Sequence, residues 1–307
     1  MTNFILRRLF YSIFVVIAVT ILVFLLSRLT GDPALLYLPE TAPMEMAERF
    51  REMNGLNRPI PVQLWDFIKG ASHLDFGKSI WQKIPASELV LSRLPLTLKL
   101  AFGTTFLASL LAILIGIFAA VRPLSLADSL TTSISLLGVT LPSFWLALLL
   151  ILIFSVDLRW LPTSGSGTWK HAVLPLTVLT WGPTGYMARV VRSSVFEQLS
   201  SPYVIAARAR GVRPASVLFR HVLPNAALPI ITVASSTFIG IANGAVIVET
   251  VFGWPGIGKL TIDAISNRDF PVLQATVFVV GIIVVLTNLV LDLLYAMIDP
   301  RIRLGKS

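Results

Sequence analysis

The sequence contains no cysteine, only three histidines and few charged residues. The absence of cysteine excludes disulfides, thiolate metal sites and a cysteine nucleophile. The histidines, His73, His171 and His221, are far apart in the chain, so no metal site is predicted. Charged residues make up 13% of the 307 residues, whereas a soluble domain has about a quarter. Because 55% of the residues are hydrophobic, the chain has too little polar surface to cover a soluble core, and membrane lipid is the expected solvent.

Six apolar stretches are each about 20 residues or longer, the length that a helix needs to cross the hydrocarbon core of a bilayer. They cover residues 9–26, 98–121, 130–156, 172–195, 226–248 and 275–298. The fourth contains Pro175, Gly182, Pro183 and Gly185, which we expect to kink it. No small-residue cleavage site follows the first stretch, so we expect it to be retained rather than removed as a signal peptide. The prediction is an all-α membrane protein with six transmembrane helices.

An even number of spans places both termini on one side, and the distribution of Lys and Arg indicates which side. With the termini in the cytoplasm, the inner segments contain twelve basic and three acidic residues, and the outer segments contain thirteen basic and twelve acidic ones. This asymmetry accounts for the net charge of +9 through membrane topology. No nucleic-acid partner is therefore predicted.

Three regions follow from this topology. Residues 1–29 form a short cytoplasmic segment and the first span, residues 30–95 form a periplasmic cap, and residues 96–307 form the core with spans two to six. Gly31-Asp32-Pro33 is typical of a turn, and residues 43–53 and 61–68 are predicted to be short helices. The cap is too small for an independent catalytic domain, which leaves a cover over the outer mouth or a docking surface.

The loop between spans four and five, residues 198–225, is the most informative segment. Ser201 suits a helix N-cap, Pro202 suits the first helical position and Gly211 suits the residue after a helix end. Pro214 can begin a second short helix that ends at Leu223-Pro224. On charge alone, this loop could simply be a basic anchor that fixes the orientation in the membrane.

The spacing of small residues in this loop resembles the signature loop of ATP-binding-cassette importer permeases. Ala206-Ala207, then Gly211, then Leu223-Pro224 match the pattern, whereas Ile205 and His221 depart from it. The absence of Glu at position 205 is common in the dipeptide, oligopeptide and nickel branch. Further motifs resemble that branch in order: Phe4–Leu9, Gly31–Ala34, His73–Ser79, Leu94–Leu98, Leu141–Trp145, Trp160–Gly165, Phe252–Gly258, Arg268–Val272 and Asp299–Arg303.

The resemblance implies a permease subunit of type I fold in the bacterial inner membrane, without an ATPase site of its own and without a cofactor. ATP and Mg²⁺ would be bound by two partner ATPase subunits, and the other partners would be a second permease and an extracytoplasmic binding protein. The residues implied to couple to the ATPases are Tyr203, Ala206, Ala207, Arg208, Ala209, Gly211, Leu223 and Pro224. Di- or oligopeptides, glutathione, nickel and metal chelates remain open as substrates, with a lean towards nickel or short peptides from the short outer loop 157–170.

Residues 253–259 match the phosphate-loop pattern, but three features argue against nucleotide binding. Leu260 replaces the Ser or Thr that would hold Mg²⁺, Pro255 removes a backbone N–H, and no β-strand is predicted before the motif. We therefore predict a turn between spans five and six.

Polar and small residues within the spans are predicted to join helices. Gly240 and Gly244 in span five suit close packing, within the chain or against a second subunit, and a substrate role is the alternative. Asn288 and Asp292 in span six suit hydrogen bonding between helices. Asp292 also defines the rival function, a proton- or ion-coupled secondary transporter. The role of Glu249, at the outer end of span five, stays open.

Overall fold

The structure, a computed structural model, describes residues 2–29, 43–53 and 55–298. Across these residues the chain is helical apart from turns and one isolated antiparallel bridge between Lys78 and Pro85. It divides into two compact units, one of Met1–Leu96 with Gly256–Leu289 and the other of Thr97–Pro255 with Val290–Ser307. Helices α5 (Ala86–Val121) and α14 (Phe270–Ile298) continue from one unit into the other. The predicted division into three regions is a different one and stays a prediction.

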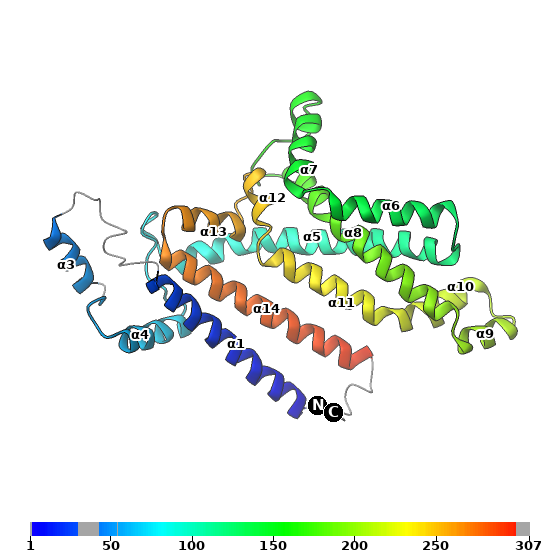
Figure 1. Cartoon of the computed structure of the whole chain (residues 1–307), viewed down its shortest axis with the longest axis horizontal. Coiled ribbons are helices and arrows are strands. Elements are labelled where there is room, and N and C mark those ends of the chain that lie inside the picture. The colour runs from blue at the N-terminus through cyan, green and yellow to red at the C-terminus, as the bar shows by residue number, and fades with distance from the viewer. Residues whose placement is uncertain (1, 30–42, 54, 299–307) are drawn as a thin grey trace. The chain divides into compact units, whose positions relative to one another are not determined.

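The first unit contains α1 (Thr2–Leu29), α3 (Met44–Met53), α4 (Ile60–Ser72) and α13 (Ile257–Ser266), together with the beginning of α5 and most of α14 (Figure 1). The two short helices predicted in the outer segment are confirmed as α3 and α4. The predicted turn at Gly31-Asp32-Pro33 lies outside the described residues.

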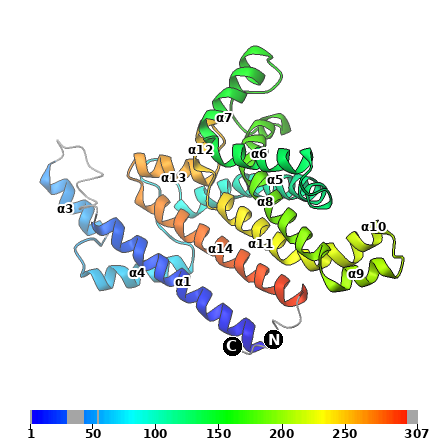
Figure 2. The ribbon, with the colours of Figure 1, turned by 45° about the vertical axis from the view of Figure 1, so that its right-hand side comes forward.

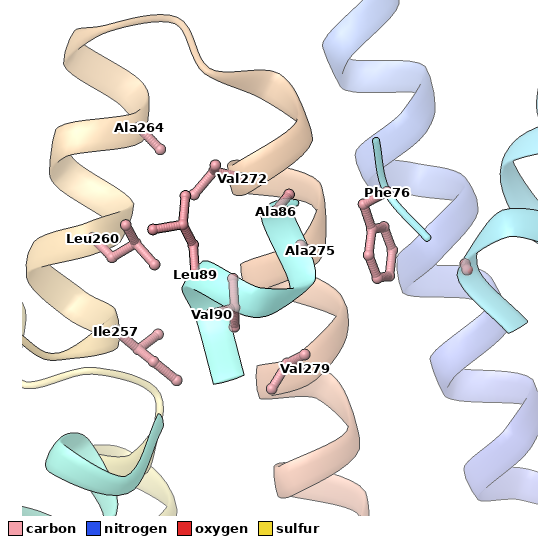
Figure 3. Packing of buried hydrophobic residues seen from close by; sticks show 11 residues of the cluster. Phe76, Ala86, Leu89, Val90, Ile257, Leu260, Ala264, Val272, Ala275 and Val279 are labelled. Atoms are coloured by element: carbon pink, nitrogen blue, oxygen red, sulfur yellow. The ribbon is translucent and has the colours of Figure 1, made fainter. Parts of the chain in front are cut away.

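The core of this unit forms where the first turns of α5 meet α13 and α14. Figure 3 shows Leu89 of α5 between Leu260 of α13 and Val272 of α14, and Val90 between Ile257 of α13 and Val279 of α14. A chain of aromatic rings extends this core, because Phe67 contacts both Phe24 and Phe76, and Phe76 contacts Phe278.

A buried carboxylate fixes the loop that leads into α5. Asp269 is 4% exposed and accepts hydrogen bonds from the hydroxyl of Ser79 and, at 3.3 Å, from the backbone N–H of Ile80. The Ser79 hydroxyl in turn accepts the backbone N–H of Gln82 at 2.9 Å. A buried carboxylate needs such partners, so Asp269 and this loop stabilise each other.

The second unit contains α6 (Leu126–Thr140), α7 (Ser143–Leu150), the π-helix η1 (Ile151–Asp157), α8 (Trp169–Leu199), α9 (Pro202–Ala209), α10 (Pro214–Val217), the π-helix η2 (Leu218–Val222), α11 (Leu223–Ala242) and α12 (Val246–Val251). The predicted fourth span is one continuous helix, α8, despite Pro175 and Pro183. Helices α6 and α8 lie side by side in both ribbon views (Figures 1 and 2).

Two predicted spans are interrupted. Residues 130–156 divide at Leu141-Pro142 into α6 and α7, because the residue before a proline disfavours the helical conformation and Leu141 is extended, with ψ of 119°. Figure 2 shows α7 turning away from the line of α6. Residues 226–248 divide into α11 and α12 at Gly244, whose φ is +103°.

Within the described residues, three helices are long and apolar enough to cross a membrane: Ala86–Val121, Pro214–Ala242 and Phe270–Tyr295. Shorter apolar helices cover Ile13–Leu25 and Ser143–Asp157. The all-helical membrane fold is thereby supported, and the total of six spans stays a prediction.

Glycine allows α6 and α8 to touch through their backbones. A Cβ atom added to Gly185 of α8 would lie 2.8 Å from the Cα of Ser135 of α6, and one added to Gly182 would lie 3.2 Å from the carbonyl oxygen of Gly138. Real Cβ atoms do not approach backbone at 2.8 Å, so no other residue fits at position 185 without moving the helices. Gly182 and Gly185, which the sequence predicts as kinks in the fourth span, are packing residues in the structure.

Candidate functional site

Helix α9 forms the centre of the candidate site, and its two faces differ. Pro202 occupies its first turn and Ser201 its N-cap position, as predicted, although the Ser201 hydroxyl donates to the carbonyl of Gln198 rather than capping the helix. Val204 is fully buried in a cluster with Val191 and Val217, and Ala207 packs against the same cluster. This apolar face therefore holds α9 against α8 and α10.

The opposite face of α9 is exposed. Besides Pro202, Tyr203 and Ile205, the exposed residues of α9 are small or basic: Ala206, Arg208 and Ala209, followed by Arg210. No acidic residue occurs between Ser201 and Asn225, and Arg213 and Arg220 are also exposed. Such a face offers a close approach over the alanines and a positive potential around them.

Gly211 ends α9 in a way that explains its presence. Its φ is +76°, a conformation that costs other residues about 1–2 kcal/mol. Its N–H donates to the carbonyl of Arg208 at 2.9 Å, and the N–H of Val212 donates to the carbonyl of Ala207 at 3.2 Å. These two bonds form a Schellman motif, and Ala207 and Val212 pack on the same buried cluster.

The second predicted short helix does not end at Leu223-Pro224. Instead α10, η2 and α11 form one helix from Pro214 to Ala242, with Pro224 in the first turn of α11. Proline is tolerated there because the five-residue π-helix η2 changes the hydrogen-bonding register just before it, the N–H of Leu223 donating to the carbonyl of Leu218. The prediction of a helix boundary at this point is wrong.

A polar cluster joins α9 to this long helix. The Tyr203 hydroxyl contacts Gln198 Oε1 at 2.5 Å and the carbonyl of His221 at 3.3 Å, and Asn225 Nδ2 donates to the same carbonyl at 2.6 Å. The loop is thus held from inside by apolar contacts and at its edge by Tyr203, while the exposed face stays available.

An ion pair joins α6 and α8 in the same unit. Arg192 donates through Nε and Nη2 to the two oxygens of Asp128, with 2.7 Å between Nη2 and Oδ2. The Asp128 side chain also accepts the backbone N–H of Leu124 at 3.1 Å. The Arg192 hydrogen bonds, followed by that of Leu124, hold the pKa of Asp128 below its ordinary value.

We expect the variant Asp128→Asn to unfold at a lower temperature than the wild type at pH 7. A carboxyl whose pKa is lowered by folding stabilises the protein above its unfolded pKa, and this contribution is lost as the pH falls through the lower folded pKa. The difference in unfolding temperature between variant and wild type should therefore begin to shrink below about pH 4, the pKa of an ordinary Asp, and shrink further as the pH is lowered towards 3. Thermal unfolding in detergent between pH 3 and pH 7 measures it. Asp66→Asn, which breaks the exposed 3.0 Å pair with Arg58, is the control and should change nothing. An equal effect of Asp128→Asn at every pH contradicts the assignment.

The residues predicted to join helices have different surroundings. Gly240 is exposed, and a Cβ added to it would meet no atom within 4 Å in the part of the chain that the structure describes, so it makes no close contact there. Gly244 lies in the turn between α11 and α12. Asn288 Nδ2 donates to the carbonyl of Val284 in its own helix, at 2.9 Å, and Asp292 is 9% exposed.

Glu249 is fully buried, and Thr97 of α5 donates a 2.7 Å hydrogen bond to its Oε1. This bond joins α12 to α5. Glu249, to which the sequence alone assigns no role, is thus a buried link between two helices.

The glycine-rich segment 253–259 begins with the predicted turn, but its last three residues, from Ile257 on, form the start of α13. Gly253 has φ of +55° and follows α12, and Gly256 is the N-cap residue of α13. No strand precedes it among the described residues.

Comparison with known families accounts for these features together. Residues 112–304 match the family described as "Binding-protein-dependent transport system inner membrane component", and residues 1–101 match its N-terminal family. The chain belongs to this family. The resemblance drawn from the sequence motifs is thereby confirmed.

Relatives of this binding-protein-dependent permease cover its whole length. It is 40% identical to the "Glutathione transport system permease protein GsiC" of Salmonella typhimurium strain LT2 and 38% identical to that of Escherichia coli strain K12, over 304 residues and 99% of each chain. Its fold is similar to that of the inward-facing MetNI methionine ABC transporter, with a TM-score of 0.58, 19% identity, and coverage of 69% of this chain and 96% of that chain.

This membership establishes the class of protein. The binding-protein-dependent permease is a multi-pass subunit of an ATP-binding-cassette importer in the inner membrane, and ATPase activity resides in partner subunits rather than in this chain. The rival function, an ion-coupled secondary transporter using Asp292, finds no support in the comparisons.

Proposed function

We propose that this permease imports glutathione or short peptides. The observation that supports this proposal is the 40% identity to a glutathione permease over 99% of both chains. The lean towards nickel rests only on the length of the loop 157–170 and gains no support from these relatives.

We also propose that the exposed face of α9, with the reversal at Gly211, docks into an ATPase subunit. Supporting features are the alanine and arginine surface, the rigid attachment of α9 through Val204, and the Schellman motif that closes the helix. A second permease would complete the membrane part, two ATPase subunits would bind Mg²⁺ and ATP, and an extracytoplasmic binding protein would deliver the substrate. Both termini and the loop 198–225 would lie in the cytoplasm, and residues 30–95 would lie outside.

Uptake by the complete transporter tests this function. The chain is reconstituted in vesicles with the second permease, the ATPases and the binding protein of its transporter, and uptake of labelled glutathione, dipeptides and nickel is measured. We expect uptake of glutathione or a short peptide that requires both ATP and the binding protein. ATPase variants unable to hydrolyse ATP serve as the control. Uptake of nickel alone would contradict the substrate, and uptake by this chain alone, driven by a proton gradient, would contradict the mechanism.

A further inference from the structure

Helix α11 carries no exposed large apolar side chain, which is unusual for a membrane span. It belongs to one of the three helices that are long and apolar enough to cross a membrane. Yet no large hydrophobic residue between positions 220 and 246 is exposed. Helix α5 of the same unit differs, since Phe106, Leu114 and Phe118 are all about half exposed or more. The surface of α5 suits lipid, and that of α11 does not.

The residues that α11 exposes form a single polar stripe. Apart from Pro224 in the first turn, the exposed residues of α11 and its C-cap residue recur at intervals of three and four, so they lie along one face of the helix: Asn225, Pro229, Thr232, Ser236, Gly240 and Asn243. The other side of α11 packs on α8, where Val233 and Ala234 contact the cluster around Met187. The stripe therefore faces away from the core of its own unit.

Backbone chemistry adds a second polar element to the stripe. Pro229 has no N–H, so it cannot donate to the carbonyl of Asn225, the usual partner in an α-helix. Irregular backbone at membrane depth is tolerated where it lines a water-filled cavity or is buried in protein, and not where it faces lipid. The Tyr295 hydroxyl of α14 also contacts Thr232 Oγ1, so a second helix brings a polar group to the same face.

The length of the stripe indicates that this face lines a water-filled passage rather than packing against a partner helix. From Asn225 to Asn243 the helix advances by eighteen residue steps, a rise of about 27 Å, which is close to the thickness of the hydrocarbon core, about 30 Å. Packing against a neighbouring helix needs small residues at one crossing point, whereas a hydrophilic passage needs polar surface at every depth. The proline and the two asparagines also make this face less suitable for close helix contact.

We propose that the polar stripe of α11 lines the aqueous passage through which the hydrophilic substrate crosses the membrane. This inference rests on the proposed function, since it assumes that the chain forms part of a translocation pathway. It assigns the passage to one face of one helix, with Ser236 and Gly240 at its centre.

The absence of cysteine allows a direct test, because one introduced thiol is the only thiol in this chain. Ser236→Cys is nearly isosteric, and Gly240→Cys has open space around the new side chain. Ala242→Cys, buried in the same helix, and Phe106→Cys, on the exposed apolar face of α5, are the controls. Each variant is assembled with its partners in vesicles and treated on both sides with a positively charged, membrane-impermeant methanethiosulfonate.

We expect the thiols at positions 236 and 240 to react at least tenfold faster than both controls, and their modification to block uptake. Thiols that react only after denaturation would overturn the proposal, as would modification that leaves uptake intact. Uptake is measured before modification in every variant and in the wild type. Failure of the wild type to support ATP-dependent uptake would count against the proposed function, whereas normal uptake with an unreactive stripe counts against this inference alone.

Discussion

Replacing Ala206 with arginine should reduce ATP-dependent uptake by about thirtyfold or more while the protein still inserts and accumulates normally. Ala206 is exposed on α9, so the new side chain does not disturb the fold. It would instead hold the docked ATPase away from the helix. Losing one central contact of an interface costs about 2 kcal/mol or more, which corresponds to roughly thirtyfold in affinity.

The neighbouring alanine supplies the matched comparison. Ala207 packs against the buried cluster of Val191, Val204 and Val217, so Ala207→Arg should lower abundance as well as uptake. Leu126→Arg, at an exposed position outside the loop, should change neither. Vesicle uptake, abundance by immunoblotting and co-purification of the ATPase separate these cases. Normal uptake by Ala206→Arg would show that this face is not where the ATPase docks.

Two substitutions at Gly211 separate the effect of backbone strain from the effect of side-chain size at the same surface. Asparagine tolerates the left-handed conformation better than other residues, so Gly211→Asn should retain most of the uptake. Gly211→Arg adds strain and a long side chain, and should abolish uptake. Equal losses in both variants would indicate that the open space at Gly211, rather than its φ, is what the partner requires.

Replacing Gly185 with leucine should remove most of the protein from the membrane. The first added atom would already lie 2.8 Å from the Cα of Ser135, so α6 and α8 must separate to accept the side chain. Overpacking of this kind typically costs about 1–3 kcal/mol, and a loss of 1–2 kcal/mol can change abundance several-fold. We expect the unfolding temperature in detergent and the abundance in cells both to fall.

Gly240→Leu is the control for this prediction. Gly240 is exposed with no atom within 4 Å of an added Cβ, so leucine fits there and abundance should stay normal. Uptake by this variant is expected to fall, because leucine would project from the polar stripe. Normal abundance of Gly185→Leu would mean that the close contact between α6 and α8 is not required for folding.

Much of this structure could be predicted from local sequence signals. Apolar runs locate the long helices, and Pro202 and Gly211 bound α9 because their backbone requirements are local. Contacts between helices could not be predicted in this way. The spacing of Gly240 and Gly244 favours close packing, yet Gly185 makes the close contact, since which helix lies opposite depends on the tertiary fold.

The sequence also could not predict which face of a helix is buried or whether a helix continues through a proline. Ala206 and Ala207 are equivalent in sequence, and only the position of the buried cluster separates the exposed alanine from the packed one. The proline at position 224 indicates a helix end, but the π-helix before it accommodates the missing N–H and the helix continues.

This continuity has a mechanical consequence. The helix from Pro214 to Ala242 has 29 residues and is about 43 Å long, so each degree of tilt displaces its far end by about 0.8 Å. A force applied at α10 is therefore transmitted to Ser236 and Gly240 along one helix, because no loop interrupts it. A tilt of about three degrees at α10 would thus move the other end of this helix by about 2 Å.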